Sequence, residues 1–297
     1  MKIFELGEDA LVARLTAALA GSGEVAVGPG DDCAAIRMAG GELCLLLKTD
    51  SVVEDVHFLR TQPPEKVGWK AICRAISDVG AMGGRPRFAL ISLASPGDLE
   101  ADYWTRFYRG LNRAARRYDV RIVGGETTRS PGPIVVTVSL TGLVETKRMV
   151  TRAGGRPGDA IYVTGRLGGS RRGRHLTFEP RVDEAAWLTR RFRPSAMMDL
   201  SDGLARDLPR LAARSGTGFA IDPRSIPRNR GCSVEQALGD GEDYELLFTL
   251  PPGEAGGLER GWKKRYPRLA LTRIGELTRK SRGGPALRGG FDHFRVD

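Results

Sequence analysis

Acidic residues recur along the chain in short, glycine-flanked segments, and their types and spacing point to cation binding. Six segments stand out: GPGDDCA (28–34), KTDSVVEDVHF (48–58), AISDVGAMGG (75–84), VGGETTR (123–129), MDLSDGL (198–204) and GDGEDYEL (239–246). Carboxylates gathered in one cleft repel one another unless they are protonated or share cations. Oxygen ligands without supporting His or Cys suit Mg²⁺. If the segments converge, they predict a site for several magnesium ions.

Each segment taken alone also has a purely structural explanation. Asp31 and Asp32 follow a Pro-Gly pair and are typical turn formers. Ser201 or Asp202 is a suitable N-cap for the helix that follows. Asp78 lies opposite the apolar stripe of its helix, a position typical of a solvent-exposed acid. The functional interpretation therefore depends on whether the fold brings these carboxylates together.

Motif searching narrows the chemistry that such a site supports. The sequence has no G-x-x-x-x-G-K-[ST] loop, no G-x-G-x-x-G fingerprint and no G-x-S-x-G elbow. Its four cysteines lack C-x-x-C spacing and its three histidines are scattered, which argues for free thiols and against zinc. Phosphoryl transfer from a metal-bound nucleotide remains, because it needs positioning and charge neutralisation more than a covalent nucleophile.

Composition indicates a globular protein. The 297 residues are enough for two domains, and 41% are hydrophobic while 28% are charged. The formal charge of +10 concentrates in the runs RRGRH (171–175), RRFR (190–193), KKRYPR (263–268) and RKSR (279–282). These runs lack interleaved aromatic residues, so we expect no primary role in nucleic-acid binding. No leader pattern and no apolar run of about 20 residues is present, and we expect a cytoplasmic protein that does not enter membranes.

Hydrophobic periodicity predicts an α/β or α+β fold. It indicates helices near 8–20, 65–81, 101–118, 183–192 and 202–215, and strands near 43–49, 88–93, 120–123, 134–144, 160–165, 218–222 and 244–250. The apolar run 43–47 is typical of a strand buried on both faces, with Asp50 emerging at its end. The Gly-rich, basic stretch TKRMVTRAGGRPGD (146–159) predicts a boundary between domains 1–148 and 149–297.

The six acidic segments, together with RAGGRPGDAIYVTG (152–165) and FDHF (291–294), occur in an order that resembles the thiamine-monophosphate kinase family, of the aminoimidazole ribonucleotide synthetase superfamily. The resemblance covers nearly the whole chain. It implies an amino-terminal ATP- and metal-binding domain with a mixed sheet and helices, through which a homodimer forms. The carboxy-terminal domain would be α/β.

The resemblance also implies an activity. The family transfers the γ-phosphoryl group of ATP to thiamine monophosphate by direct in-line, Mg²⁺-assisted displacement, giving thiamine diphosphate. Attack of one phosphate on another brings two polyanions together, so charge neutralisation is the largest catalytic requirement. The acceptor phosphate is already ionised near neutral pH, its second pKa being about 6. No strong general base is needed, and the sequence offers no obvious candidate.

The resemblance assigns residues to three tasks. Metal ligands would be Asp32, Thr49, Asp50, Asp78, Glu126, Asp199 and Asp202, of which Asp50, Asp78, Glu126 and Asp199 would be catalytic. Contacts to ATP would come from Gly125, Arg152 and Ser201, with Arg152 as a phosphate clamp. The thiamine end would be bound by His57, Glu242 and Phe291, with Phe291 stacking on a thiamine ring. The alternative for His57 is an ordinary packed histidine.

Three departures from the family pattern are visible. Glu126 stands where the family usually has Asp, one methylene shorter. Lys48 stands where many members have a small hydroxyl residue, and its ammonium would neutralise part of the acidic set and displace one ion. RRGRHLTFEPR (171–181) replaces a helix of small residues, so the carboxy-terminal domain looks shorter by about one helix. We expect this to affect how the protein closes over the nucleotide.

Three alternative functions stay open at this point. One is another ATP-dependent synthetase or kinase of the superfamily with a different acceptor. The second is a non-catalytic nucleotide-binding protein, which Mg²⁺-dependent ADP release would distinguish from an enzyme. The third is a polyanion binder, which predicts steep salt dependence without a need for magnesium.

Overall fold

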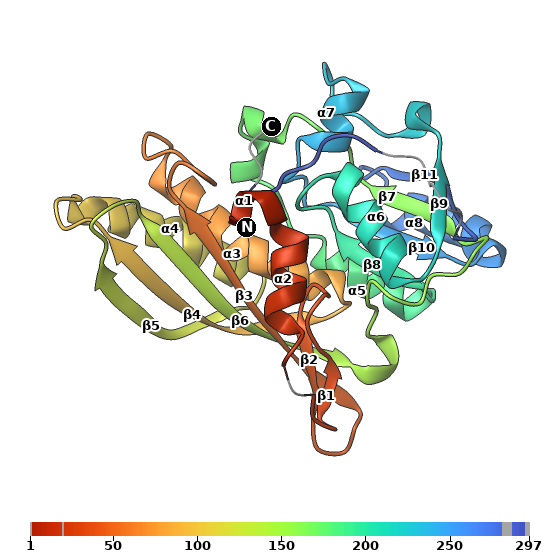
Figure 1. The fold of residues 1–297 in the computed structure, drawn as a ribbon, viewed down its shortest axis with the longest axis horizontal. Coiled ribbons are helices and arrows are strands. Elements are labelled where there is room, and N and C mark those ends of the chain that lie inside the picture. The colour runs from red at the N-terminus through yellow and green to blue at the C-terminus, as the bar shows by residue number, and fades with distance from the viewer. Residues whose placement is uncertain (1, 20, 281–286, 295–297) are drawn as a thin grey trace.

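Two β-sheets organise the chain in the computed structural model, which describes residues 2–19, 21–280 and 287–294 (Figure 1). The first sheet has the order β1-β2-β3-β6-β4-β5, and only its β4–β5 pair is parallel. Its strands are β1 Val25–Val27, β2 Ala34–Arg37, β3 Leu43–Val53, β4 Arg85–Ser95, β5 Arg121–Arg129 and β6 Val135–Glu145. This mixed sheet confirms the amino-terminal half of the predicted fold.

The second sheet is antiparallel throughout, with the order β8-β10-β7-β11-β9. Its strands are β7 Ala160–Thr164, β8 Ala196–Asp199, β9 Gly218–Ile221, β10 Leu246–Leu250 and β11 Leu271–Thr278. The predicted division at residue 148 falls in the connection between β6 and β7. As a domain boundary it stays a prediction.

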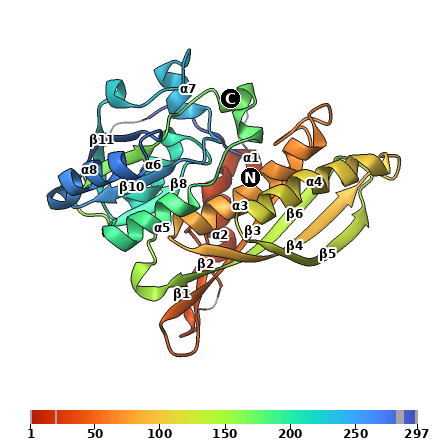
Figure 2. The same ribbon diagram turned by 180° about the vertical axis from the view of Figure 1, so that it is seen from behind.

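Helices α3 Pro64–Ala81 and α4 Ala101–Arg117 cover one face of the first sheet (Figure 2). Two glycines allow these helices to approach each other closely. A Cβ on Gly68 would lie 2.0 Å from the carbonyl oxygen of Phe107, and one on Gly110 would lie 1.7 Å from that of Glu65. Any larger residue at either position would push α3 and α4 apart.

The prediction that residues 43–47 are buried on both faces is wrong. Cys44 and Leu46 are fully buried, but Leu43 and Leu47 are 38% and 40% exposed. The helices cover only one face of the sheet, so alternate residues of β3 face outward. The strand also continues to Val53, so Asp50 lies within it and not at its end.

The second sheet, by contrast, is covered on both faces. Ile161 and Val163 of β7 pack in one core with α6 Leu204–Arg214, while Ala160 and Tyr162 pack in another. That other core includes α5 Val182–Arg191 and α8 Ala255–Arg265. All five residues of β10 are buried, and the strand lies within the predicted range 244–250.

Helix α3 joins the two halves, because it contacts α5 and β8 as well as the first sheet. The segment 171–181 is anchored to it: the indole nitrogen of Trp69 donates a hydrogen bond of 2.8 Å to the carbonyl oxygen of Phe178. The ring of Phe178 stacks on Tyr244 with centroids 3.8 Å apart. Side chains therefore pack across the junction between the halves. The candidate active site described below lies at this junction.

Short elements complete the fold. They are α1 Ile3–Leu6, α2 Glu8–Thr16, α7 Val234–Gly239 and the 3-10 turns η1 Thr146–Arg148, η2 Ser170–Arg172, η3 Arg174–Leu176, η4 Pro223–Ser225 and η5 Pro252–Glu254. The helix predicted over 8–20 ends at Thr16, with Leu15 and Leu19 exposed. Residue 20 and residues 281–282 of the last basic run lie outside the described residues.

Two further sequence expectations concern cysteines and membranes. Cys33, Cys44, Cys73 and Cys232 are free thiols, as predicted. Among the described helices, none combines the length and apolar character needed to span a bilayer.

Candidate active site

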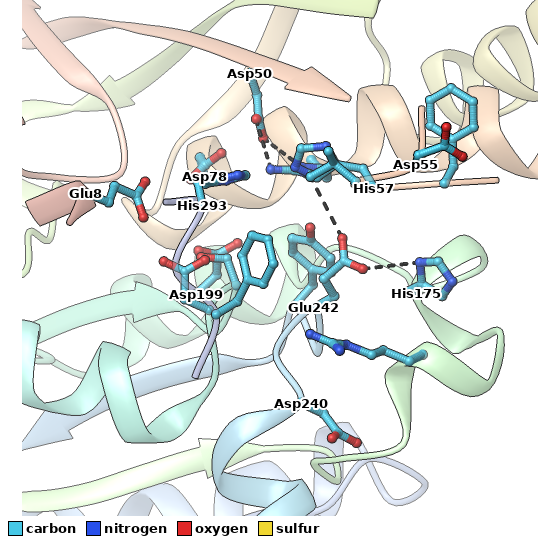
Figure 3. Close-up of a pocket in the computed structure, with 18 of the residues that line it drawn as sticks. Glu8, Asp50, Asp55, His57, Asp78, His175, Asp199, Asp240, Glu242 and His293 are labelled. Atoms are coloured by element: carbon cyan, nitrogen blue, oxygen red, sulfur yellow. Dashed lines mark hydrogen bonds and ion pairs between the residues drawn. The ribbon is translucent and has the colours of Figure 1, made fainter. Parts of the chain in front are cut away.

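A cavity of about 420 Å³ opens at the junction of the two halves (Figure 3). One part of its wall consists of residues of β3, of α3 and of the loop after β3. The other part includes residues of the loop after β8 and of the loop before β10. Among the residues predicted from the sequence, it is lined by Asp50, His57, Asp78, Asp199, Ser201, Asp202, Glu242 and Phe291. The fold thus brings eight predicted site residues to one cavity.

Three carboxylates converge at one end of this cavity and form what we call the acidic cluster: Asp32, Asp78 and Asp199. One oxygen of each lies within 4.8 Å of the others, and all three residues are buried. Asp32 precedes β2, Asp78 lies near the end of α3, and Asp199 is the last residue of β8. The solvent-exposed interpretation of Asp78 is therefore wrong, because α3 is buried on nearly all sides at the junction.

The acidic cluster contains oxygen atoms without partners. Oδ2 of Asp32 and Oδ1 of Asp199 are buried and accept no hydrogen bond from the described residues. The other oxygen of Asp199 accepts a hydrogen bond of 2.5 Å from the Ser77 hydroxyl. Burial and the neighbouring Asp32 raise the pKa of Asp199 to about 7. Buried, unpaired oxygen ligands of this kind fit a hard divalent cation such as Mg²⁺.

Two cationic side chains reach into the acidic cluster. Nζ of Lys48 lies 3.0 Å from Oδ2 of Asp78, and the Arg152 guanidinium donates to Oδ1 of Asp32 at 2.5 Å. Burial alone would lower the pKa of Lys48, but the charges of Asp78 and Asp50 raise it above its ordinary value. Lys48 therefore stays charged, and the prediction that it neutralises part of the acidic set agrees with this geometry.

Two further predicted metal ligands line the cavity but are paired with arginines. Asp50 accepts hydrogen bonds of 3.0 and 3.1 Å from Arg74. Burial would raise the pKa of Asp50, but the charges of Arg74 and Lys48 lower it, so it is ionised. The carboxylate of Asp202 accepts a hydrogen bond from Arg210. Both acids line the cavity, and each is paired with an arginine.

Three predicted residues lie away from the cavity. The Thr49 hydroxyl is on the uncovered face of the first sheet, 3.4 Å from that of Ser139. Gly125 and Glu126 are exposed on the edge strand β5, and the Glu126 carboxylate accepts a hydrogen bond from the Thr127 amide. A Cβ on Gly125 would lie 1.8 Å from the carbonyl oxygen of Ile91, so glycine is needed there for strand pairing. Within one chain these residues do not join the acidic cluster.

A second charged group, which we call the lysine hub, lies at the other end of the cavity. It consists of Lys70 with His57, His175 and Glu242. The fully buried Nζ of Lys70 lies 2.6 Å from Oε1 of Glu242, 2.5 Å from the carbonyl oxygen of His57 and 2.8 Å from Nδ1 of His175. One ammonium therefore connects α3 to three separate segments of the chain. Figure 3 shows His57, His175 and Glu242 of this group, with Glu242 directed toward His175.

Glu242 is ionised in this setting. Burial would raise its pKa, but a hydrogen bond with His175 and the charges of Lys70 and Arg74 lower it to about 2. Oε2 of Glu242 lies 3.2 Å from Nδ1 of His175. Sequence analysis predicted Glu242 but missed Lys70 and His175. The available signals were a lysine within an apolar helix and the unusual segment 171–181.

His57 is held as a neutral ring. The Val53 amide donates a hydrogen bond of 3.0 Å to Nδ1 of His57, so this nitrogen carries a lone pair and not a proton. Burial and the charges of Arg74 and Lys70 lower the pKa of His57 to about 3. The ring lines the cavity, and this hydrogen bond fixes its orientation.

The FDHF segment brings aromatic rings to the same end. The ring of His293 lies 5.2 Å from that of His57 and 4.8 Å from that of Phe291. The Phe291 amide donates a hydrogen bond of 2.9 Å to the carbonyl oxygen of Asp202, which fixes the segment against the loop after β8. An aromatic wall therefore lies beside the lysine hub.

The loop that carries Glu242 has an unusual backbone. Glu242 and Tyr244 adopt φ angles of +52° and +51°, which residues other than glycine rarely do. Backbone hydrogen bonds from Glu242 to Ser201 (2.6 Å) and from Tyr244 to Leu200 (2.8 Å) hold this conformation. Such conformations persist only where the surroundings enforce them, and they concentrate at functional sites.

Comparison with known proteins agrees with this fold. Residues 30–144, which contain Asp32 and Asp78 and most of the six-stranded sheet, match the sequence family described as AIR synthase related protein, N-terminal domain. The chain is 39% identical over 306 residues to thiamine-monophosphate kinase of Aquifex aeolicus, with 93% of each chain covered. It is 33% identical over 327 residues to the enzyme of the same name from Escherichia coli K12, covering 97% of this chain and 98% of that one.

A solved structure is similar to this chain over nearly its whole length. The structure described as AaThiL complexed with AMPPCP and TMP matches with a TM-score of 0.83 and 36% identity, covering 99% of both chains. This chain belongs to the thiamine-monophosphate kinase family.

Proposed function

We propose that the protein transfers the terminal phosphoryl group of ATP to thiamine monophosphate, giving ADP and thiamine diphosphate. The observation that carries this proposal is the match, over 99% of both chains, to a structure described as a complex with AMPPCP and TMP. An ATP analogue and the acceptor occupy that relative together. The cavity described above offers a chemically distinct end for each part of such a pair.

The acidic cluster is the proposed phosphate end. Asp32, Asp78 and Asp199 would hold Mg²⁺, and Asp50 and Asp202, which line the same cavity, would contribute if Arg74 and Arg210 release them. Bound Mg²⁺ supplies neutralisation of the negative charge that builds up when two phosphates approach. Arg152 adds a fixed positive charge beside Asp32. Ser201 contributes a hydroxyl to the cavity wall.

The lysine hub is the proposed thiamine end. Glu242 is an ionised, oriented acceptor for a donor group of the ligand, since three cationic or hydrogen-bonding neighbours hold its carboxylate. His57 presents a neutral ring in a fixed orientation. Phe291 and His293 provide aromatic surface for stacking on a heteroaromatic ligand.

We also propose that two copies form a homodimer through the amino-terminal sheet, in the cytoplasm. The uncovered face of that sheet exposes apolar side chains that normally seek a partner: Leu43, Leu47, Phe88, Leu90 and Val123. Thr49 lies on the same face. The cytoplasmic location rests on the proposed use of ATP.

The test is a product assay. Purified protein is incubated with ATP, Mg²⁺ and thiamine monophosphate, and ADP and thiamine diphosphate are quantified together, with a parallel reaction that lacks thiamine monophosphate. We expect equal amounts of the two products and little ADP in the parallel reaction. ADP without thiamine diphosphate would indicate a different acceptor, and no product at all would contradict the kinase assignment.

A further inference from the structure

We propose that the ammonium of Lys48 is a built-in cation of the acidic cluster and takes the place of one divalent metal ion. The proposal rests on the proposed function only in treating the cluster as a metal site. Its consequence is that this chain binds one ion fewer at the cluster than a chain with a small hydroxyl residue at position 48.

The position of Lys48 on β3 directs its side chain into the site. Residues 44, 46 and 52 of this strand are buried against α3, and Lys48 and Asp50 follow the same alternation. The Lys48 side chain is 22% exposed, toward the cavity that it lines. Its Nζ therefore lies between the strand and Asp78, at the mouth of the acidic cluster.

The charge balance of the cluster indicates what this ammonium does. The three carboxylates of the acidic cluster are matched by two fixed cations, Lys48 and Arg152, which leaves a formal charge of −1. Without Lys48 the charge would be −2. Replacing an ammonium by a small neutral side chain both increases the negative charge and opens space beside Asp78.

The distribution of paired and unpaired oxygens shows which position the ammonium occupies. Oδ2 of Asp78 is taken by Lys48, whereas Oδ1 of Asp199 and Oδ2 of Asp32 have no partner among the described residues. A divalent ion at Asp78 would lie within a few ångströms of the ammonium, where like charges in a partly buried site repel strongly. Lys48 therefore excludes an additional ion at Oδ2 of Asp78 and leaves open the one position that the three carboxylates share.

The competing explanation is that Lys48 only stabilises the fold by pairing with Asp78. Both explanations predict that removal of the charge destabilises the metal-free protein. They differ in metal stoichiometry, because a purely structural ion pair has no effect on how many ions bind. Counting bound ions therefore separates them, and this count does not require turnover.

The experiment titrates Mn²⁺, as a detectable substitute for Mg²⁺, into the nucleotide-free protein and counts bound ions by electron paramagnetic resonance. Four variants are compared with the unmodified chain: Lys48→Ser, Lys48→Met, Lys48→Arg and the control Lys147→Ser, whose lysine is 79% exposed. We expect Lys48→Ser to bind one additional ion per chain. Lys48→Met should bind the same number as the unmodified chain but about tenfold more tightly, because the charge is gone while the space stays filled.

Lys48→Arg and Lys147→Ser should both match the unmodified chain. Equal stoichiometry in the unmodified chain and Lys48→Ser would overturn the proposal, as would the absence of Mn²⁺ binding by all of them. If Lys48→Ser does not fold, the ion count of Lys48→Thr, which also removes the charge and opens space, decides. Failure of the kinase assignment is detected separately, because it concerns product formation by the unmodified chain and not the ion count.

Discussion

The acidic cluster and the lysine hub use the same ingredients, buried carboxylates beside a lysine, but they differ in how completely the charges are paired. In the hub, Nζ of Lys70 lies within 2.8 Å of three polar atoms, and the charge of Glu242 is balanced at 2.6 Å. In the cluster, Lys48 forms an ion pair with Asp78 at 3.0 Å, while Oδ2 of Asp32 and Oδ1 of Asp199 accept no hydrogen bond from the described residues. Oε1 of Glu242 in the hub accepts none either, but it lies 2.6 Å from the Lys70 ammonium. The contacts of the lysine hub form a closed network that holds its side chains in place. The acidic cluster is open, because some of its carboxylate oxygens can still bind a cation.

The pKa values of carboxylates in the two groups also differ. Burial disfavours the charged form of both Glu242 and Asp199, yet the pKa of Glu242 falls to about 2 and that of Asp199 rises to about 7. The opposite directions follow from the neighbours, since Glu242 has Lys70 and Arg74 and Asp199 has Asp32. Burial alone therefore does not decide the charge of a carboxylate in this protein.

The largest expected effect is on the stability of the hub. Lys70→Met would remove the cation nearest to the half-buried Glu242 and leave it with Arg74 at 3.9 Å and His175 at 3.2 Å, so we expect the free energy of unfolding to fall by about 3 kcal/mol. Adding Glu242→Gln should restore much of this loss. Urea denaturation of the single and double variants measures both values, with Lys147→Met as the exposed-lysine control. No recovery in the double variant would contradict the closed network.

The next effect is on turnover at the cluster. Asp199→Asn should lower the rate of thiamine diphosphate formation at least about a hundredfold, because it removes a carboxylate that we assign to Mg²⁺. The matched control is Asp119→Asn, at an 86% exposed residue with a φ of +55°, a conformation that asparagine tolerates. Equal rates in the two variants would remove the assigned role of Asp199.

The pH dependence of stability should reveal the neutral His57. Its pKa is about 3 in the folded protein and about 6.5 when unfolded, so between these values the unfolded state binds more protons. The free energy of unfolding therefore decreases as pH falls from about 6.5 toward 3, by up to about 1.4 kcal/mol per pH unit. His57→Asn, which keeps an acceptor for the Val53 amide, should flatten this loss. Thermal unfolding of the unmodified chain and of His57→Asn between pH 7 and pH 4 measures this loss of stability. Parallel plots of stability against pH for the two proteins would contradict a neutral His57 in the folded state.

The smallest effect is expected on the edge strand. Glu126→Asp shortens an exposed side chain of β5 by one methylene group, outside both charged groups. We expect a change in stability within about 0.5 kcal/mol. Chemical denaturation tests this, and a larger loss would show that Glu126 contributes contacts beyond its hydrogen bond with Thr127.

Periodicity and family resemblance predict much of the fold, and the shortfalls have physical causes. Long helices such as α3 and α4 are predicted within a residue or two. The strand β8 is missed because four residues carry too little periodic signal. The apolar run 43–47 is misassigned because a sequence does not show whether a sheet is covered on one face or on two.

The site is predicted unevenly for a similar reason. The resemblance identifies Asp32, Asp78 and Asp199, which converge. It also names Thr49 and Glu126, which lie elsewhere in a single chain. The partners of Lys70 include His175, 105 positions away, and nothing local in the sequence signals such a contact.

The central claim is that the acidic cluster, and not the lysine hub, takes up divalent cations. The most direct test compares Mn²⁺ binding by calorimetry in two matched carboxylate-to-amide variants, Asp199→Asn and Glu242→Gln, one from each group. The account predicts that Asp199→Asn loses about a hundredfold in affinity while Glu242→Gln binds Mn²⁺ like the unmodified chain. Equal affinity of the two variants, or a loss confined to Glu242→Gln, would contradict it.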